Sequence, residues 1–201
     1  MVAHNLAQSA GISVPPARML QLGNGHRTFC VKRFDRHNGR RVFYASARTM
    51  LSRTDSHGAS YLDLAQFIMS NGAHTFIKDD LAQLFRRVIF NIAIGNRDDH
   101  LRNHGFVLTE TGWRLSRAFD VNPNHEKADH VLNIDDRDNR PLIENALATA
   151  EYYELTNDQA VKIASEVTAV IKSWKDVGKQ YNIPRADINL MEGVFLSRHV
   201  E

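Results

Sequence analysis

The chain has 201 residues, of which 43% are hydrophobic, so it can bury one proper core, and its length favours a single domain with at most a small appendage. It carries 25 Lys and Arg residues against 23 Asp and Glu residues, a formal net charge of +2, which is too near neutral to indicate nucleic-acid binding from charge alone. Because it has no apolar run of membrane-spanning length, no signal-peptide pattern and one cysteine, we expect a cytoplasmic globular protein without membrane contact or an internal disulfide.

The N-terminal part of the chain holds most of the expected β structure. Leu6, Ala7 and Ala10 followed by Gly11 predict the end of a short helix with a glycine stop. The runs "ARMLQL" and "TFCVKRF", joined by the turn "GNG" at residues 23–25, have the composition of a β-hairpin, since Asn-Gly supplies the positive φ angles of a tight turn. Cys30 is expected to be a small buried hydrophobic residue, and the basic stretch "KRFDRHNGRR" a solvated hairpin.

Two helices are expected in the middle of the chain. Residues 61–70 are too apolar on one face to be left exposed. The stretch "DDLAQLFRRVIFNIAIG" places its apolar residues at helical spacing, starts with Asp79 and Asp80 as caps, and ends at Gly95. This second helix has the clearest pattern in the sequence.

The last part of the chain is expected to be mainly helical, after one more hairpin. That hairpin runs from "GFVL" through the turn "TETG" into "WRLSRAFD", and its far strand is expected to end at Asp120. Helices are then predicted over residues 141–150, over "LTNDQAVKIASEVTAVIKSWKDVGKQY" with Thr156 as its cap, and over "RADINLMEGVFLSRH" after Pro184. Three side chains on apolar faces are expected to pack in the core: Trp174, Met191 and Phe195.

A dense polar cluster, "IGNRDDHLRNHGF", follows the central helix directly. Asp98 and Asn103 have the spacing D-x-x-x-x-N, and Asp120 follows one hairpin later, which is the order found in protein kinases. In that order the first Asp accepts the proton of the substrate hydroxyl, while the Asn and the later Asp hold Mg²⁺. Phosphoryl transfer needs hard oxygen ligands and a nearby cation, which His100 or Arg102 could supply.

Each part of this pattern also has a plainer interpretation. A loop of Asp, Asn and Arg is commonly polar turn chemistry, and Asp120 could open an Asx turn before Pro123. His100 and His104 are four residues apart and could share a helix face, but the "LRN" between them lacks the Glu of a zinc-protease helix. Packing or capping is therefore favoured over zinc binding for His104.

Taken together, "RVIFNIAIGNRDDHLRNHGFVL" and "WRLSRAFDVNPN" resemble the HipA family of bacterial serine/threonine kinases. The family pattern is an apolar helix, then "FN…GNxDDHxKN…F", then a strand running into "L…A(Y/F)D". The stretch "VKRFDR" resembles the family's strand and adenine-side hinge, and "AGISVPPARML" the segment before it. The region with Trp174, residues 182–184 and Ile188 resembles the helical end of the family's large lobe, so the similarity covers nearly the whole chain.

The resemblance implies roles for the polar cluster. Asp98 would be the catalytic base and His100 a contact to the γ-phosphate. Asn103 and Asp120 would be the Mg²⁺ ligands. Asp99 would be either a participant in the chemistry or a loop-stabilising carboxylate that accepts hydrogen bonds from backbone amides.

The resemblance also implies an ATP site near the N-terminal hairpin. The backbone around Lys32 and Phe34 would face the adenine. Arg33, Asp35 and Arg36 would form a structural charge cluster beside it.

The chain departs from the family pattern at its front. It shows neither the phosphate-covering loop nor the strand lysine of a full-length member, and it has no glutamate before Glu110. We therefore expect an N-terminally truncated α+β, mainly α, protein-kinase-like fold, with residues 1–36 as a remnant of the small lobe and hinge and residues 37–201 as a HipA-like helical C-terminal kinase lobe. Positioning of the γ-phosphate is expected to be impaired in the chain alone.

Three functions are compatible with these features. The first is an ATP- and Mg²⁺-dependent serine/threonine protein kinase of a toxin–antitoxin system, which the retained Asp98, Asn103 and Asp120 favour. The second is a non-catalytic remnant that regulates transcription as the partner of a helix-turn-helix antitoxin and reaches DNA only through it, which the missing small-lobe parts favour. The third is a metal-dependent phosphoesterase built on Asp98, His100, His104 and Asp120. No residue identifies the protein substrate.

Overall fold

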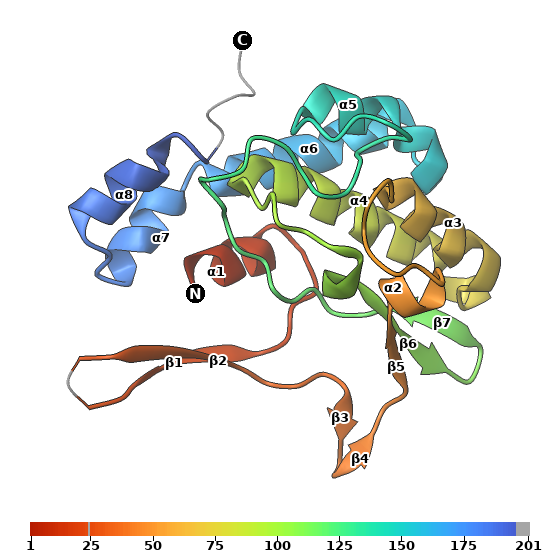
Figure 1. Cartoon of the computed structure of the whole chain (residues 1–201), viewed down its shortest axis with the longest axis horizontal. Coiled ribbons are helices and arrows are strands. Elements are labelled where there is room, and N and C mark those ends of the chain that lie inside the picture. Colours follow the sequence, from red (N-terminus) through yellow and green to blue (C-terminus); the bar gives the residue numbers. More distant parts are fainter. Residues whose placement is uncertain (24, 196–201) are drawn as a thin grey trace.

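A computed structural model of the chain describes residues 1–23 and 25–195. Figure 1 shows a mainly helical body with small antiparallel sheets along one side. In chain order the elements are α1 (Val2–Ser9), β1 (Ala17–Gln21), β2 (Arg27–Val31), β3 (Arg36–His37), β4 (Arg40–Arg41), β5 (Tyr44–Ser46), α2 (Ala47–Met50), α3 (Tyr61–Asn71), α4 (Ile77–Ile94), β6 (Gly105–Thr109), β7 (Gly112–Leu115), α5 (Ile143–Ala148), α6 (Asn157–Ile171), α7 (Trp174–Gln180) and α8 (Arg185–Glu192). Short 3₁₀ helices occur at His74–Phe76, Leu101–Asn103 and Ala150–Tyr153.

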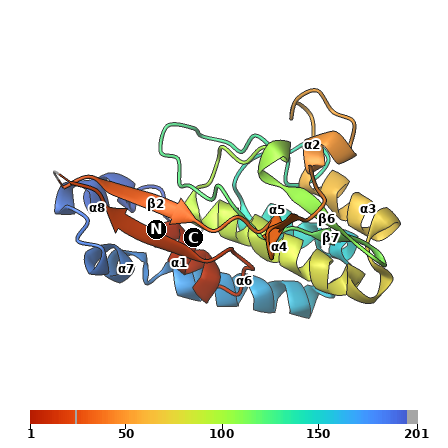
Figure 2. The same cartoon turned by 90° about the horizontal axis from the view of Figure 1, so that it is seen from below.

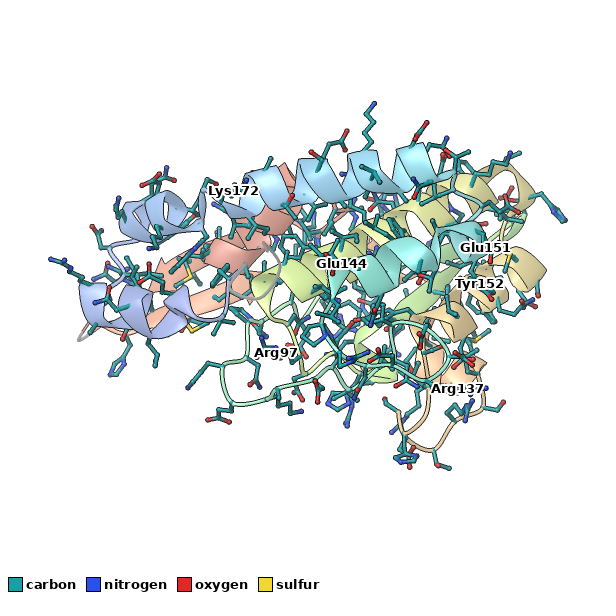
Figure 3. All side chains as sticks on the ribbon, turned by 90° about the horizontal axis from the view of Figure 1, so that it is seen from above. Arg97, Arg137, Glu144, Glu151, Tyr152 and Lys172 are labelled. Carbon is teal, nitrogen blue, oxygen red and sulfur yellow. The ribbon has the colours of Figure 1, made fainter. Side chains whose placement is uncertain are left out.

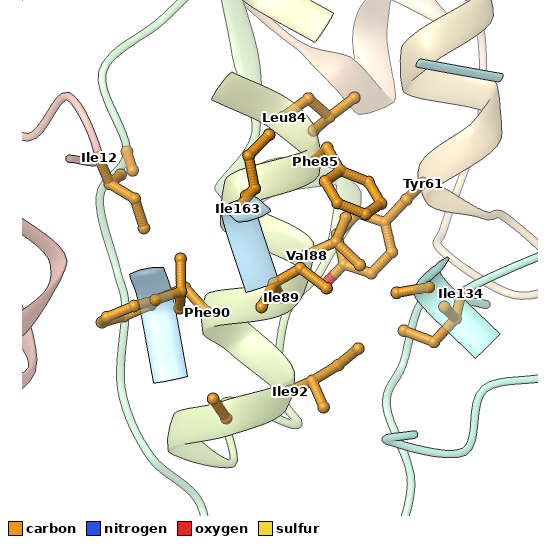
Figure 4. Packing of buried hydrophobic residues seen from close by; sticks show 14 of the residues in the cluster. Ile12, Tyr61, Leu84, Phe85, Val88, Ile89, Phe90, Ile92, Ile134 and Ile163 are labelled. Atoms are coloured by element: carbon orange, nitrogen blue, oxygen red, sulfur yellow. The ribbon is translucent and has the colours of Figure 1, made fainter. Parts of the chain in front are cut away.

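Helix α4, whose helical pattern was the clearest in the sequence, is the centre of the hydrophobic core. Its Leu84, Phe85 and Val88 are fully buried, and the helix packs against α3, α5 and α6. Figure 4 shows these side chains between Tyr61 of α3 and Ile163 of α6. Tertiary packing of apolar side chains such as these supplies most of the stability of a helix in a protein.

The two ends of α4 differ in how well the sequence predicted them. Gly95 ends the helix in the left-handed conformation with φ of 67°, as expected for a glycine stop. The start was wrong, because the helix begins at Ile77, and the residue before it caps no backbone N–H with its side chain. The Asp80 carboxylate instead accepts hydrogen bonds from Arg114 at 2.8 and 3.0 Å and from the backbone N–H of Leu115 at 2.9 Å. Asp80 therefore forms an ion pair with a distant strand and does not cap the start of its own helix.

The N-terminal hairpin is confirmed. Strands β1 and β2 are antiparallel, with Ala17 opposite Val31, while Asn24 of the expected turn lies outside the described residues. The hairpin runs beneath α1 and α7 in Figure 1 and, in the view from below, crosses in front of α1 in Figure 2. Arg27 donates a hydrogen bond to the Tyr181 carbonyl at 2.6 Å. Cys30 is half-buried, not buried as expected, because a two-stranded ribbon leaves both of its faces partly open. The basic stretch forms the exposed β3–β4 hairpin, as predicted.

The second hairpin is shorter than its sequence suggested. Strand β6 pairs with β5 on one side and β7 on the other, and β7 ends at Leu115, not at Asp120. The Ser116 N–H still bonds the carbonyl of Gly105, the first residue of β6. Because Gly105 is the first residue of β6, the residues after Ser116 have no β6 residue left to pair with. Residues 116–120 are therefore irregular chain.

The C-terminal helices are confirmed with one break. Thr156 and Gln159 form a capping box at the start of α6. The long helix expected here is split between α6 and α7, because the Ser173 N–H and Oγ both bond the Val170 carbonyl, at 3.1 and 2.8 Å, and turn the chain. Trp174 stacks on Phe195 at 4.4 Å between ring centroids, which confirms their core positions. The predicted last helix ends at Glu192, and its residues 196–199 lie outside the described part.

Helix α1 belongs to the same core. It packs against α6 and α7, and its Ala3, Leu6 and Ala7 are part of the cluster that contains the apolar side chains of α4. Residues 1–12 are therefore held by the helical body. Among the described residues, no helix is both long and apolar enough to cross a membrane.

Candidate functional site

The candidate site lies in the loop of residues 95–104, which joins the end of α4 to the start of β6. A second loop, residues 116–142, folds against it. The Asn124 N–H bonds the Gly95 carbonyl at 2.8 Å, and the buried Arg97 side chain donates to the Lys127 carbonyl at 2.6 Å. Figure 3 shows Arg97 on this loop-rich side of the molecule, away from Lys172 at the end of α6. The two loops are thus held together at the carboxyl end of the central helix.

Asp98 is exposed at the surface of this loop. His100 Nε2 lies 3.1 Å from Asp98 Oδ1, and the Lys127 ammonium group makes an ion pair with the same oxygen. The hydrogen bond from Lys127 lowers the pKa of Asp98, and the nearby His100 acts in the same direction. Asp98 is therefore an accessible, ionised carboxylate beside two groups that carry or can carry positive charge.

Lys127 was not recognised in the sequence. It lies 29 residues after Asp98, in the irregular stretch "NHEKADH", where no periodicity or motif marks it. The only signal was a lysine in a loop otherwise rich in acidic and imidazole side chains.

The Lys127→Met variant is expected to have a higher Asp98 pKa, closer to that of an ordinary carboxyl group, because the donor that most favours its ionised form is removed. A carboxyl-carbon NMR titration of the wild type and the variant, without added metal, would measure this change. Lys179→Met is the matched control, since Lys179 pairs with Asp176 on α7. An Asp98 pKa that is equal in wild type and Lys127→Met would contradict the contact.

Asp99 points in the opposite direction and is 2% exposed. Its Oδ2 accepts hydrogen bonds from Tyr61 Oη at 2.6 Å, Asn91 Nδ2 at 2.8 Å and His104 Nε2 at 2.6 Å. Burial pushes the pKa of Asp99 upward, but the charge and hydrogen bond of His104 and the hydroxyl of Tyr61 outweigh it and keep the pKa low. Of the two expected roles, Asp99 therefore has the structural one, because it stabilises the loop. Its hydrogen-bond donors are side chains and not the expected backbone amides.

Asn103 lies five residues after Asp98, in the same loop, and contacts its backbone. Its Nδ2 is 3.4 Å from the Asp98 carbonyl oxygen, and its backbone N–H bonds the His100 carbonyl at 2.8 Å. The side chain is 8% exposed, and its Oδ1 accepts no hydrogen bond from the described residues. An amide oxygen held in this way can serve as a ligand for a hard cation.

His104 lies in the core with Asp99, and among the described residues no hydrogen bond or ion pair joins it to Asp98 or His100. It is buried against Asp99 and Tyr61, with its ring edge-on to Tyr61 at 5.7 Å. The predicted packing role is confirmed, and the phosphoesterase arrangement of Asp98, His100, His104 and Asp120 is wrong. Within the described residues, no group of three or more His, Cys, Asp and Glu side chains could hold a metal ion.

Asp120 lies on the second loop, with a positive φ of 55°. Its Oδ1 accepts a hydrogen bond from the Asn122 side chain at 2.9 Å, so the alternative Asx turn to a backbone N–H is not formed. The side chain is exposed, and it lines a cavity of about 280 Å³ together with Phe29 and Val31 of the hairpin. Among the described residues, no hydrogen bond or ion pair joins Asp120 to Asp98 or Asn103.

Lys32 and Phe34 line a separate, neighbouring cavity of about 400 Å³. Its wall also contains Tyr44, Phe119 and Arg102. The Phe34 ring meets Tyr44 at 5.4 Å and Phe119 at 5.7 Å between centroids. The Lys32 backbone N–H is already bonded to the Pro16 carbonyl at 2.8 Å, so a flat ligand here would rely on the aromatic side chains and the remaining backbone carbonyls.

The charge cluster beside this cavity is confirmed. Asp35 accepts hydrogen bonds from Arg33 at 2.8 and 2.6 Å and from Arg36 at 2.5 Å. The Arg33 hydrogen bond lowers the pKa of Asp35 to about 2. All three groups are close to solvent, so the cluster fixes the local chain more than it stabilises the fold.

The donors of the loops suit magnesium. Asn103 and Asp120 both offer oxygen, and Mg²⁺ is commonly held by one or two such protein ligands, with waters and phosphate oxygens completing its shell. Binding of Mg²⁺ together with phosphate oxygens does not require a cluster of three carboxylate or histidine ligands. The residues present therefore fit a nucleotide-bound Mg²⁺ better than a stand-alone metal centre.

A helical body, a small antiparallel sheet and a polar loop between the central helix and that sheet define a protein-kinase-like fold. The chain belongs to the HipA family, because the family model of the HipA-like C-terminal domain matches residues 1–174. No curated protein matches the sequence.

Two solved structures resemble the chain. HipA from the Shewanella oneidensis MR-1 toxin–antitoxin system, solved with HipB and operator DNA, has a TM-score of 0.76 at 17% identity, over 94% of this chain and 51% of that one. The Helicobacter pylori proinflammatory kinase CtkA has a TM-score of 0.57 at 12% identity, over 96% of this chain and 80% of that one. The chain thus spans about half the length of the Shewanella protein.

Proposed function

We propose that the chain is the C-terminal lobe of a HipA-like serine/threonine kinase that transfers the γ-phosphate of ATP to a protein hydroxyl. The observation that carries this proposal is the contrast between two adjacent carboxylates. Asp99 is buried and anchors the loop, whereas Asp98 is exposed and kept ionised beside His100 and Lys127. An accessible, unprotonated carboxylate on a fixed loop can accept the proton of a substrate hydroxyl.

In the proposed reaction, Asp98 accepts the proton of the substrate hydroxyl, and His100 contacts the γ-phosphate. Lys127 would add positive charge near the transferred group, where negative charge is spread over the equatorial oxygens. Asn103 and Asp120 would hold Mg²⁺, which neutralises phosphate charge when bound.

The adenine would occupy the cavity of Lys32 and Phe34, between the rings that line it. In this assignment residues 1–36 correspond to the small-lobe and hinge part and residues 37–201 to the large lobe. Flat aromatic walls suit a purine, since stacking on such rings is favourable for any base.

A helix-turn-helix antitoxin is the proposed protein partner, and DNA would be reached only through it. The support is the similarity to a HipA solved with HipB and operator DNA. The second candidate function follows from the same similarity: a chain that contacts such an antitoxin without catalysing phosphoryl transfer.

Calorimetric titration of a non-hydrolysable ATP analogue, with and without Mg²⁺, tests the proposal. We expect Mg²⁺-dependent binding to the wild type and an affinity lower by about tenfold in Asp120→Asn, because an anionic oxygen ligand becomes a neutral amide. Asp158→Asn on α6 is the matched control and should bind like the wild type. Absence of nucleotide binding in all three proteins would sink the kinase assignment and favour the antitoxin-contact function.

A further inference from the structure

A polar cavity of about 520 Å³ is lined by His100 and shares Arg102 with the proposed adenine cavity. Three segments meet there: helix α2 with the loop that follows it, the loop of residues 95–104, and the part of the second loop that contains Val131, Asn133 and Asn139. The side chains that matter for the argument are Arg48, Asp55, His57, His100, Arg102 and Asn133. We call this the basic cavity.

The walls of the basic cavity are fixed by hydrogen bonds between the segments. Ser56 Oγ accepts from the Leu101 N–H at 3.0 Å, which ties the α2–α3 loop to the loop of Asp98. Asn133 donates its N–H to the Ala59 carbonyl at 2.9 Å and accepts from the Tyr61 N–H at 3.0 Å. The cavity is therefore a built feature of the fold and does not depend on one loose loop.

The charge of the basic cavity is unbalanced. The lining contains two guanidinium groups, Arg48 and Arg102, two imidazoles and a single carboxylate, Asp55. The Asp55 Oδ1 accepts a hydrogen bond from the His57 N–H at 2.9 Å, and the His100 imidazole contacts Asp98 outside the lining. Neither guanidinium makes a hydrogen bond or ion pair within the described residues. In contrast, several other arginines of the chain pair with a carboxylate: Arg33, Arg36, Arg86, Arg114, Arg137 and Arg140.

Two residues connect the basic cavity to the proposed chemistry. His100 lines it and is also 3.1 Å from the Asp98 carboxylate. Arg102 lines it and also lines the cavity of Lys32 and Phe34. A polypeptide that presents a hydroxyl to Asp98 would therefore lay its neighbouring residues into the basic cavity.

We propose that the basic cavity binds an acidic segment of the protein that is phosphorylated, with Asp or Glu side chains close to the accepting serine or threonine. The inference rests on the proposed kinase function and adds the substrate class. The guanidinium group of arginine binds a carboxylate with two parallel, charge-assisted hydrogen bonds. These are stronger than hydrogen bonds to a neutral amide, so a carboxylate is preferred. The substrate carboxylates would then supply the partners that Arg48 and Arg102 do not have within the described chain.

The test uses a short fluorescein-labelled peptide with one serine flanked by aspartates, and a matched peptide with asparagines in their place. Fluorescence anisotropy would follow their binding to the full chain. The acidic peptide should bind more tightly, and Arg48→Glu should weaken it by about tenfold. Arg53→Glu is the matched control: it lies five residues away on the exposed α2–α3 loop, does not line the cavity, and should bind the acidic peptide like the wild type.

The outcomes separate this inference from the kinase proposal. Equal affinity for both peptides, or equal loss in Arg48→Glu and Arg53→Glu, would overturn the acidic-segment site even where Mg²⁺-dependent nucleotide binding is normal. A single-stranded oligonucleotide that displaces the acidic peptide at lower concentration would overturn it in favour of nucleic acid. A preference for the acidic peptide that depends on Arg48, in a chain without nucleotide binding, would support the acidic site and remove only its link to phosphoryl transfer.

Discussion

Replacing Asp99 by alanine is expected to lower the free energy of unfolding by about 3–5 kcal/mol, the usual cost of removing one partner from a buried charged network. Asp99 accepts hydrogen bonds from Tyr61, Asn91 and His104 at 2.6 to 2.8 Å. All of these groups lie away from water. Without the carboxylate, the Tyr61 hydroxyl and His104 Nε2 would lose their acceptor in the core, and Asn91 Nδ2 would keep only its hydrogen bond to Tyr61 Oη at 3.2 Å.

Urea denaturation of the wild type and of Asp99→Ala measures this loss. Asp98→Ala is the natural control, since it removes the same carboxylate one residue earlier but at an exposed position, where changes are usually within about 0.5 kcal/mol. Similar losses in the two variants would contradict the division of roles between Asp98 and Asp99. The comparison does not depend on any enzymatic activity.

The stability carried by Asp99 is also expected to depend on pH. Its pKa in the folded chain is lowered, below the value of about 3.9 for an unfolded Asp. The contribution is therefore fully present above about pH 4 and is lost as the pH falls through the folded pKa. The difference in stability between wild type and Asp99→Asn, measured by urea denaturation at a series of pH values, should shrink in that acidic range.

Local signals in the sequence predicted the elements of the fold but not all of their ends. The spacing of apolar residues and Gly95 predicted α4 and its last residue. Asp80 looked like a cap, yet Arg114 and Leu115 bind its carboxylate from a distant strand. The break between α6 and α7 depends on hydrogen bonds from Ser173 to the turn before it, and the apolar pattern runs through that break unchanged.

The candidate site was predictable only where its residues lie close in sequence. Asp98, His100 and Asn103 follow from one motif, and they do lie together in one loop. Lys127 reaches Asp98 from a segment without any regular pattern. The basic cavity is similar, because Arg48 approaches His100 only through the folding of three separate segments.

Gly105 connects the candidate site to the sheet, and its substitution is the second large effect expected. It is the first residue of β6, directly after the loop of Asp98. A Cβ atom at this position would lie 2.4 to 2.5 Å from three atoms of the Tyr44 side chain, two ring carbons and the hydroxyl oxygen. Gly105→Ala should therefore cost about 1–3 kcal/mol of stability, as is usual for an added group in a well-packed place.

The same substitution should weaken nucleotide binding, because Tyr44 cannot give way alone. Its ring packs edge-on against Phe34 and lies 6.3 Å from Phe119, and all three line the proposed adenine cavity. A Tyr44 ring pushed away from Gly105 would move into that cavity or displace its neighbours. The loss of stability and the loss of nucleotide affinity should then appear together in Gly105→Ala.

A double-mutant cycle with Tyr44→Ala separates this clash from a general effect of the new methyl group. In the Tyr44→Ala background the added Cβ meets no ring, so Gly105→Ala should cost little there, and urea denaturation of the four proteins gives the coupling directly. Gly23→Ala is the control for glycine replacement, since a Cβ at Gly23 has no atom within 4 Å. An equal loss of stability on Gly105→Ala in both backgrounds would mean that Tyr44 does not occupy the space next to Gly105. The Tyr44 ring would then not form the wall of the proposed adenine cavity.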